Sequence, residues 1–347
     1  MPVTLHDVAR EANVSIKTVS NVVRGQGNFG DETRRRVEAA IEKLGYRPNL
    51  AARGLRSGRL GVIGLIVPDI RNPYFAELAD AVMRAAAQHD LLVVLEQSDG
   101  DPDTELELLQ GTRTRIVDGI LFSVLGLGAG DERLGADVTT PVVVLGEPIP
   151  GWHTDWVSMR HLEGAAAATA HLVASGRRRI AAIGARQEER VGSASLRLEG
   201  YRRALAEAGL PVDEALIERE PIWGRSQGAD AVRRLLDAGR SFDGLVAFND
   251  ALALGALRAL EDRGLRVPED VGVIGFDDID ETRYTRPTLS TVRPEIADLA
   301  ATAVGYLQRR IEERAGAGAG GAGGGAGVRV RGHRAACALL VRGSSAA

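Results

Sequence analysis

Short apolar runs alternate with longer helical segments from Leu60 onward, and this alternation constrains the fold more than any other feature of the sequence. The apolar runs are GVIGLIVPDI, LLVVLEQSD, GILFSVL, PVVVLGE, RRIAAIGA, GLVAFND and VGVIGFDD. Segments with apolar residues at helical spacing separate most of them, such as FAELADAVMRAAAQHD and ALALGALRALEDRGL. Strands that alternate with helices predict parallel sheets covered on both faces. Roughly ten strands exceed what one small sheet holds, so we expect an α/β core of two doubly wound lobes.

The two lobes are expected to meet near His161. The first lobe is predicted to span about 60–161 plus 293–314, and the second about 162–292 plus 328–347. The low-complexity stretch AGAGAGGAGGGAG, from Ala315 to Gly327, has the composition of a flexible surface insertion. A last strand, ACALLVRG, is expected to follow it.

The first 46 residues predict an all-α head of three short helices. Thr4 and Asp7 in TLHD form a capping box at the start of the first helix. Ser15 is the expected cap of the second helix, after a short turn. Asp31 begins a third helix, which stops at Gly45. We therefore predict a helix-turn-helix domain over residues 1–47, followed by a basic hinge or linker over 48–59.

The second helix, from about Ile16 to Val23, has two different faces. Its inward positions are expected to be Val19, Val22 and Val23. Polar residues spaced i, i+3, i+4 and i+7 share the outer face: Lys17, Ser20, Asn21 and Arg24. A helix in this position of a helix-turn-helix fits the DNA major groove. The alternative is an ordinary three-helix domain with a solvated polar face.

Individual side chains of this helix suit particular contacts to DNA. Lys17 can bond guanine O6 and N7, and Asn21 suits adenine N6 and N7. Ile16 could touch a thymine methyl group, whereas Thr18 and Ser20 are better suited to phosphate contacts or capping.

Basic residues are concentrated at the start of the chain. Residues 1–59 contain eleven Lys and Arg against six Asp and Glu, a net charge of +5, so the total of −4 leaves −9 for residues 60–347. A basic head on an acidic body indicates that the head meets an anionic partner. Compositional drift in an Arg-rich chain is the alternative, and charge alone does not separate the two.

Several classes of protein lack support in the sequence. No apolar run has the length to cross a bilayer, and MPVTLHDVAR lacks the pattern of a secretory signal. Cys337 is the only cysteine and the six His form no ligand-spaced cluster, so we expect no metal site and no cofactor. These features predict a cytoplasmic protein without a membrane partner.

An enzyme and a transport-type binding protein are the two competing classes. No enzyme is expected because there is no G-x-G-x-x-G at a strand-to-helix turn, no Walker lysine and no G-x-S-x-G. The adjacent Asp277 and Asp278 make a poor acid–base pair, since neighbouring side chains in an extended segment diverge. A transport protein would share the two-lobed core, but the added head and the missing signal argue against it.

Two stretches of the head, VTLHDVAREANVSIKTVSNVVRG and ETRRRVEAAIEKLGYRPNLAARGLRSGR, resemble the DNA-binding head of the lactose-repressor (LacI/GalR) family of transcription factors. The resemblance continues through GVIGLIVPDIRNPYFAEL, LVAFNDALALGALRAL, VPEDVGVIGFDD and TLSTV to LLVRGSSA. It implies a homodimer that binds a near-palindromic operator in double-stranded DNA. It also implies a core similar to periplasmic sugar-binding proteins, with a small-molecule effector, most often a sugar, bound in a cleft between two lobes.

The linker supports this resemblance physically. Pro48 and Asn49 can start a helix that is too short to be stable alone in water, so it would order only on DNA. By resemblance Leu55 is the hinge leucine that wedges between bases in the minor groove. The DNA-contacting set implied for the whole head and hinge is Thr4, Ser15, Ile16, Lys17, Thr18, Ser20, Asn21, Arg24, Asn49, Ala52, Arg53, Leu55 and Arg56.

The effector contacts are expected in turns that follow the strands, where open α/β sheets bind ligands. The set implied by resemblance is Asn72, Tyr74, Phe75, Glu147, Arg190, Arg197, Trp223, Asn249 and Asp277. Carboxylate, amide and guanidinium groups can hold sugar hydroxyls while a ring face packs on an indole. Structural alternatives remain for three of them: Asn249 and Asp277 could cap helices, and Trp223 could belong to the core.

This chain also departs from the family pattern. Met159, Arg160 and His161 stand where relatives often have Val-Asp-Asn, and Pro294 stands where some have a polar ligand residue. The loop that contains Arg190 is longer than the pattern expects. We therefore expect an allosteric transcriptional regulator, a dimeric repressor, whose effector and direction of response the sequence leaves open.

Overall fold

The computed structural model describes residues 3–23, 29–46, 59–110, 116–128, 131, 133–134, 138–186, 192–319 and 329–346. The chain divides into two compact units, a head up to Leu60 and a core from Gly61. The predicted hinge residues 48–58 and the insertion residues 320–327 lie outside the described residues.

In the part of the head that the structure describes, the helices are α1 (Leu5–Glu11), α2 (Ile16–Val23) and α3 (Asp31–Leu44). They surround a small core that is centred on the fully buried Val8, Val19 and Val37. The backbone turns between α1 and α2 at Asn13, which has a φ of 51°. Asn tolerates this left-handed conformation better than most residues because its short polar side chain bonds locally.

One prediction for the head is wrong. Val19 and Val22 pack into the head core, but Val23 is 37% exposed and lies outside that cluster. Val23 is the last residue of α2, and three short helices bury only a narrow stripe of each helix.

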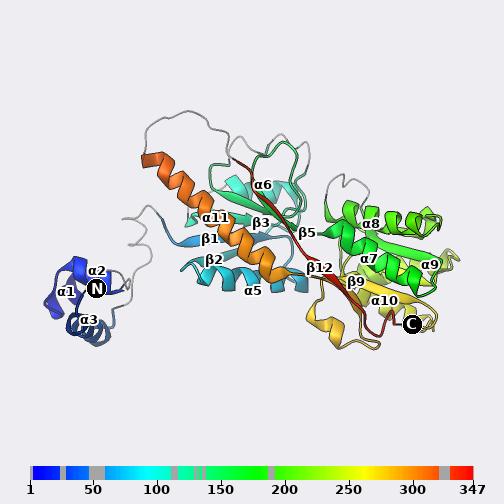
Figure 1. Cartoon of the computed structure of the whole chain (residues 1–347), viewed down its shortest axis with the longest axis horizontal. Helices are drawn as coiled ribbons and strands as arrows, with labels where there is room; N and C mark the ends of the chain where they lie inside the picture. Colours follow the sequence, from blue (N-terminus) through cyan, green and yellow to red (C-terminus); the bar gives the residue numbers. More distant parts are fainter. Residues whose placement is uncertain are drawn as a thin grey trace. The chain divides into compact units, whose positions relative to one another are not determined.

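The first lobe is a six-stranded parallel sheet in the order β11-β5-β4-β3-β1-β2. Figure 1 labels β1, β2, β3 and β5 of this sheet. Its strands are β1 (Val62–Val67), β2 (Leu92–Gln97), β3 (Gly119–Phe122), β4 (Val142–Leu145), β5 (Asp155–Met159) and β11 (Gly332–Ala335). The helices around it are α5 (Pro73–Ala87), α6 (Pro102–Gln110) and α11 (Ile296–Ala319). Leu65 and Val67 of β1 pack with α5 and α11, whereas Ile66 packs with α6. The sheet is therefore covered on both faces, as the apolar runs predict.

The second lobe repeats this plan with the strand order β12-β10-β9-β8-β6-β7, in which only β12 runs antiparallel to its neighbour. Its strands are β6 (Ile180–Ala185), β7 (Ile217–Arg219), β8 (Gly244–Ala247), β9 (Gly272–Phe276), β10 (Ser290–Pro294) and β12 (Cys337–Leu340). The helices are α7 (His161–Ala174), α8 (Ser193–Glu207), α9 (Arg225–Asp237) and α10 (Asp250–Asp262), with two 3-10 turns, η2 (Glu214–Leu216) and η3 (Asp280–Arg283). Ala181 and Ile183 pack with α9 and α10, while Ile180 and Ala182 face α7 and α8.

The chain passes between the lobes through three crossover segments, residues 159–161, 294–296 and 335–337. They are bonded to one another, because Arg160 N–H donates to Ala335 O at 3.3 Å and Glu295 N–H donates to Ala336 O at 2.9 Å. The predicted division of the lobes needs correction here. Residues 332–335 join the first sheet rather than the second, and β10 keeps residues 293–294 in the second lobe.

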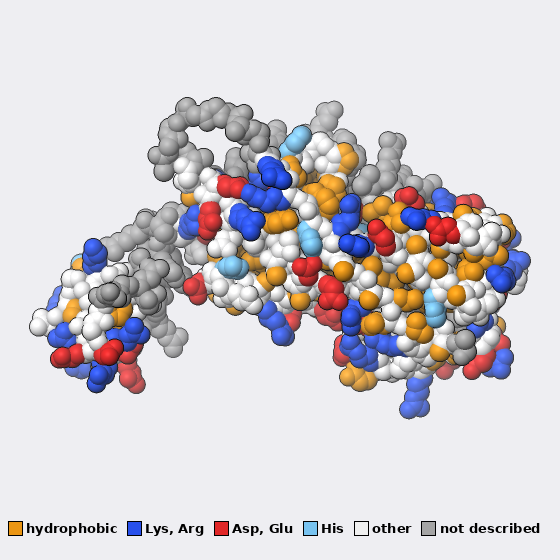
Figure 2. Space-filling view, viewed as in Figure 1, with side chains coloured by type: hydrophobic (Ala, Val, Ile, Leu, Met, Phe, Trp, Pro, Cys, Tyr) orange, Lys and Arg blue, Asp and Glu red, His pale blue; other side chains and the backbone are white. Residues whose placement is uncertain are grey.

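The surface of the core mixes both signs of charge. On the face shown in Figure 2, Lys and Arg side chains are interspersed with Asp and Glu side chains over both lobes. Within the residues that the structure describes, no helix has the length and apolar content to span a membrane. In that same part of the chain, no group of three or more His, Cys, Asp or Glu side chains is placed to hold a metal ion.

Helices α9 and α10 pack at glycines, which leads to a stability prediction. A Cβ atom on Gly255 would lie 1.8 Å from the carbonyl oxygen of Arg225, so Gly255→Ala must push the two helices apart. We expect it to destabilise the core by ~1–3 kcal/mol, the usual cost of overpacking. Gly305→Ala in α11 is the matched control, since nothing lies within 4 Å of its Cβ position. Thermal unfolding should show a lower Tm for the first variant and an equal or higher Tm for the second, and equal Tm values for the two would contradict this packing.

Candidate functional site

The second helix of the head begins with the capping arrangement predicted for it. Thr18 N–H donates to the Ser15 hydroxyl at 3.0 Å, and the Ser15 and Thr18 hydroxyls lie 2.8 Å apart. This cap satisfies a backbone donor at the helix start and so defines where α2 begins. Thr18 is therefore engaged within the helix, which is one of the two roles predicted for it.

The outer face of α2 carries the polar residues predicted there. Lys17 is exposed, and Ser20 and Asn21 are half-exposed. Ile16 packs partly into the head core, so only part of its side chain is accessible. Exposed Thr4 precedes α1, where both its N–H and its hydroxyl donate to Asp7, at 3.0 and 2.7 Å. The remaining predicted DNA contacts lie outside the described residues: Arg24, Asn49, Ala52, Arg53, Leu55 and Arg56.

In the core, Arg197 on α8 lies where the two lobes meet, and its side chain is only 3% exposed. Its Nε–H donates to His161 Nδ1 at 3.2 Å, and one terminal nitrogen donates to the carbonyl oxygen of Phe248. The other terminal nitrogen lies 3.7 Å from Met159 Sδ and 3.6 Å from Asp277 Oδ1. A buried guanidinium needs such partners because an unpaired charge away from water is costly.

Two aromatic rings enclose this guanidinium. The carbon Cζ of Arg197 lies 3.6 Å from the centre of the Phe276 ring and 5.3 Å from that of Trp223. Trp223 donates its indole N–H to Gly184 O at 2.9 Å and also faces the guanidinium of Arg186 at 5.0 Å. Trp223 also packs against the apolar clusters on both faces of the second sheet. It therefore belongs to the core, as the structural alternative predicts, and it also borders Arg197.

Asp277 follows β9 in a conformation that L-residues rarely adopt, with a φ of 115°. Burial raises the pKa of Asp277 to about 7, the guanidinium of Arg197 opposes this shift, and the Glu77 carboxylate adds to it. Asp278 also has a positive φ, of 55°, yet its carboxylate points to other partners. The two neighbouring carboxylates therefore diverge, as the sequence predicts.

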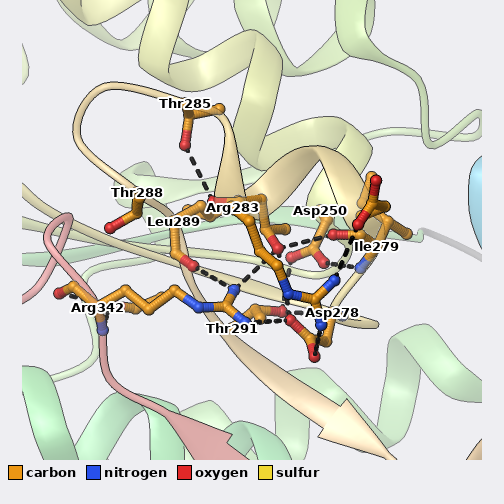
Figure 3. A network of polar contacts seen from close by, with 12 residues as sticks. Asp250, Asp278, Ile279, Arg283, Thr285, Thr288, Leu289, Thr291 and Arg342 are labelled. Carbon is orange, nitrogen blue, oxygen red and sulfur yellow. Dashed lines mark hydrogen bonds and ion pairs between the residues drawn. The ribbon is translucent and has the colours of Figure 1, made fainter.

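A polar network holds the turn after Asp277 in place (Figure 3). Arg342, near the end of the chain, donates to Asp278 at 2.6 Å, and Arg283 donates to it at 3.3 Å. Behind them the buried Asp250 accepts the Thr291 hydroxyl at 2.7 Å and the N–H of Ile279 at 3.1 Å. Burial, reinforced by the Asp277 carboxylate, raises the pKa of Asp250 well above its usual value. Strained backbone persists only where neighbouring groups fix it, and this network does so.

Two asparagines of the predicted set serve as helix caps. Asn72 accepts the Tyr74 N–H at 3.2 Å at the start of α5, and Asn249 accepts the Leu252 N–H at 2.8 Å at the start of α10. Asn249 therefore caps a helix, which is the structural alternative given for it from the sequence. Its amide nitrogen donates to the carbonyl oxygen of Trp223 at 3.2 Å, which links it to the Arg197 group. No such cap is formed by Asp277, because the N-cap of η3 is Ile279.

The first lobe contributes aromatic and acidic side chains from two places. Tyr74 and Phe75, at the start of α5, contact each other edge to face at 5.1 Å. Burial raises the pKa of Tyr74, the carboxylate of Asp277 in the second lobe adds to this shift, and the guanidinium of Arg197 opposes it. Buried Glu147 accepts the Ser158 hydroxyl at 2.7 Å and an N–H of Arg334 at 2.6 Å.

The structure therefore brings together Tyr74, Arg197, Trp223, Asn249 and Asp277, which we call the junction cluster. Arg190 lies outside the described residues. A separate hollow of about 530 Å³ lies along α8, and none of the predicted effector residues lines it. The junction cluster offers a guanidinium, carboxylate, phenol and indole, which are groups that bind hydroxyl-rich molecules.

Sequence reasoning missed several pairings close to this cluster. Arg334 and Arg342 are separated from Glu147 and Asp278 by 187 and 64 residues, so no local pattern links the pairs. The sequence singles out His161 as the expected lobe boundary and as a departure from the family pattern, but does not indicate its bond to Arg197.

Comparisons with known proteins agree on one family. Residues 4–49 match the family model for bacterial regulatory proteins of the lacI family, and residues 169–320 match a periplasmic binding protein-like domain. Catabolite control protein A from Priestia megaterium is 37% identical over 311 residues, which is 89% of this chain and 92% of that protein.

Solved structures give the same result for the fold. A putative LacI-family regulator from Sanguibacter keddieii has a TM-score of 0.74 at 45% identity, over 83% of this chain and 99% of that one. The regulator CelR in complex with cellobiose has a TM-score of 0.71 at 29% identity, over 99% of both chains. The lac repressor dimer bound to operator and the anti-inducer ONPF has a TM-score of 0.82 at 26% identity, over the full length of both. The predicted helix-turn-helix head and two-lobed α/β core are thereby confirmed, and the chain belongs to the lacI family of bacterial regulatory proteins.

Proposed function

We propose that this chain is a repressor that binds a near-palindromic operator as a homodimer and responds to a carbohydrate at the junction cluster. The observation that carries the proposal is the pairing of two sites in one chain. The head presents Lys17 and Asn21 on a capped helix, and the core gathers Arg197, Trp223 and Asp277 where its lobes meet.

The DNA half of the proposal rests on the geometry of α2. Its buried face is held by Val19, so the polar side chains of the opposite face are presented together. A helix of this kind reads base edges in the major groove, and two copies related by symmetry read two half-sites. The similar lac repressor is a dimer bound to operator, which supports the same assembly here.

The effector half rests on the chemistry of the junction cluster. Its guanidinium and carboxylate can bond vicinal hydroxyls, and Tyr74 and Trp223 supply apolar surface for a sugar ring. The similar CelR binds cellobiose, which is a ligand of this class. Because the cluster takes groups from both lobes, a ligand there can bias the lobe arrangement and thereby the DNA-bound state.

Substitutions on α2 test the DNA half. We expect Lys17→Ala and Asn21→Ala each to weaken binding to a selected inverted-repeat duplex by ~1–3 kcal/mol, the usual value of one base contact. Lys43→Ala is the control, because Lys43 lies on α3 and pairs with Glu11 at 2.6 Å. Lys43→Ala removes one positive charge from the head, as Lys17→Ala does, and should lower the affinity for specific and scrambled duplexes by the same factor. Gel-shift titrations at matched salt measure this, and equal losses for specific and scrambled duplexes in all three variants would contradict base reading by α2.

The ionisation of Asp277 predicts a pH dependence. With a pKa of about 7, its carboxylate is mostly protonated at pH 6 and mostly ionised at pH 8. An ionised carboxylate accepts hydroxyl hydrogen bonds more strongly, so the affinity for a bound sugar should rise with pH, by about tenfold over this range. Asp277→Asn should bind more weakly and lose the pH dependence. Calorimetric titration with sugars identified by a thermal-shift screen measures it, and a wild-type affinity that does not change between pH 6 and pH 8 would contradict the role of Asp277.

A further inference from the structure

His161 occupies a structurally sensitive position. It is the first residue of α7 and ends the crossover segment 159–161 that leads out of β5. Its side chain is buried, with 6% of the residue exposed, and its ring lies 6.1 Å from that of Phe276. The imidazole therefore sits beside the path on which the chain passes from the first lobe to the second.

The contact between His161 and Arg197 fixes the protonation of the ring. Arg197 Nε–H donates to His161 Nδ1 at 3.2 Å. A guanidinium has no acceptor, so Nδ1 must offer its lone pair, and the proton of the neutral ring must be on Nε2.

The charges around the ring also favour its neutral form. Burial is the main cause that holds the pKa of His161 well below its usual value, and the positive charges of Arg197 and Arg334 add to it. Asp277 lies beyond the guanidinium, 3.6 Å from Arg197, and Glu147 accepts from Arg334. The carboxylates of Asp277 and Glu147 are thus each paired with an arginine.

Arg197 joins strand ends from both lobes through its other contacts. It touches Met159 at the end of β5 in the first lobe, and Phe248 and Asp277 beyond β8 and β9 in the second. The bond that Arg197 donates to His161 restrains the rotation of the guanidinium about its long axis, and this rotation decides which nitrogen faces Asp277. Arg forks recognise their partners through such fixed geometry.

We propose that His161 is a positioning residue which, as the Nε2–H tautomer, orients the guanidinium of Arg197 for effector recognition at the lobe junction. The inference rests on the proposed effector site, but the first part of its test involves no effector.

The first test reads the ring directly in the full-length chain. Long-range ¹H–¹⁵N spectra of ¹⁵N-histidine-labelled protein show six rings, and the signals lost in His161→Gln identify His161. We expect the Nε2–H tautomer and no titration between pH 8 and pH 6. A ring with its proton on Nδ1, or one charged at pH 7, would overturn the proposal.

The second test reads Arg197 through its Nε–H signal. A glutamine at position 161 can still accept the hydrogen bond, whereas a phenylalanine fills similar space and cannot. We expect His161→Phe to speed solvent exchange of the Arg197 Nε–H by at least tenfold, and His161→Gln to restore slow exchange. Unchanged exchange in a folded His161→Phe variant contradicts the proposal, and thermal unfolding of both variants establishes that they are folded.

The third test uses cellobiose and ribose as probes. If either sugar binds the wild type, His161→Phe should lose at least tenfold in affinity while His161→Gln stays within threefold. Equal affinity in all three proteins would overturn the positioning role. Failure of the wild type to bind any carbohydrate would instead count against the proposed function, and the two spectroscopic tests would still decide the state of His161.

Discussion

A buried arginine at the meeting point of two lobes must be paired on every side, and this requirement organises the core. Arg197 has a strand end of the first lobe beside it at Met159, and strand ends of the second lobe at Phe248 and Asp277. Desolvation makes an unpaired guanidinium costly, so these segments are held in one arrangement as long as the charge remains buried. A ligand that replaces any of these contacts of Arg197 changes the interactions between the two lobes. Binding of a small molecule can therefore change the arrangement of the lobes.

The carboxylate that faces Arg197 depends in turn on the end of the chain. Asp277 and Asp278 both have positive φ angles, and Arg342 and Arg283 pair with Asp278 behind the site. The C-terminal segment therefore stabilises a strained turn that presents Asp277. This segment follows β12, which pairs with β10, so strand pairing in the second lobe places Arg342 beside Asp278.

Local patterns predicted most of the fold, while contacts distant in sequence escaped prediction. The caps of the head helices and the long apolar strands depend on residues that are close in sequence, so local patterns predict both. Short strands such as β7 and β11, with sequences IER and GHRA, are too polar to stand out and exist because a neighbouring strand pairs with them. The site residues are predicted by resemblance, which does not supply the pairing of Arg334 with Glu147 or the imidazole acceptor at position 161. The cap formed by Asn249 is local, and the sequence offers it as an alternative.

The proposed regulator joins a DNA-reading head and an effector site in one chain, and in this proposal Arg197 is the group that senses the effector. The most direct measurement is the operator affinity of wild type and Arg197→Lys, titrated with a sugar that shifts the wild type. The account predicts that sugar changes the operator affinity of the wild type and leaves that of Arg197→Lys unchanged, each protein being compared with its own sugar-free affinity. An Arg197→Lys protein whose operator affinity still responds to the sugar as the wild type does would contradict the central role of this guanidinium.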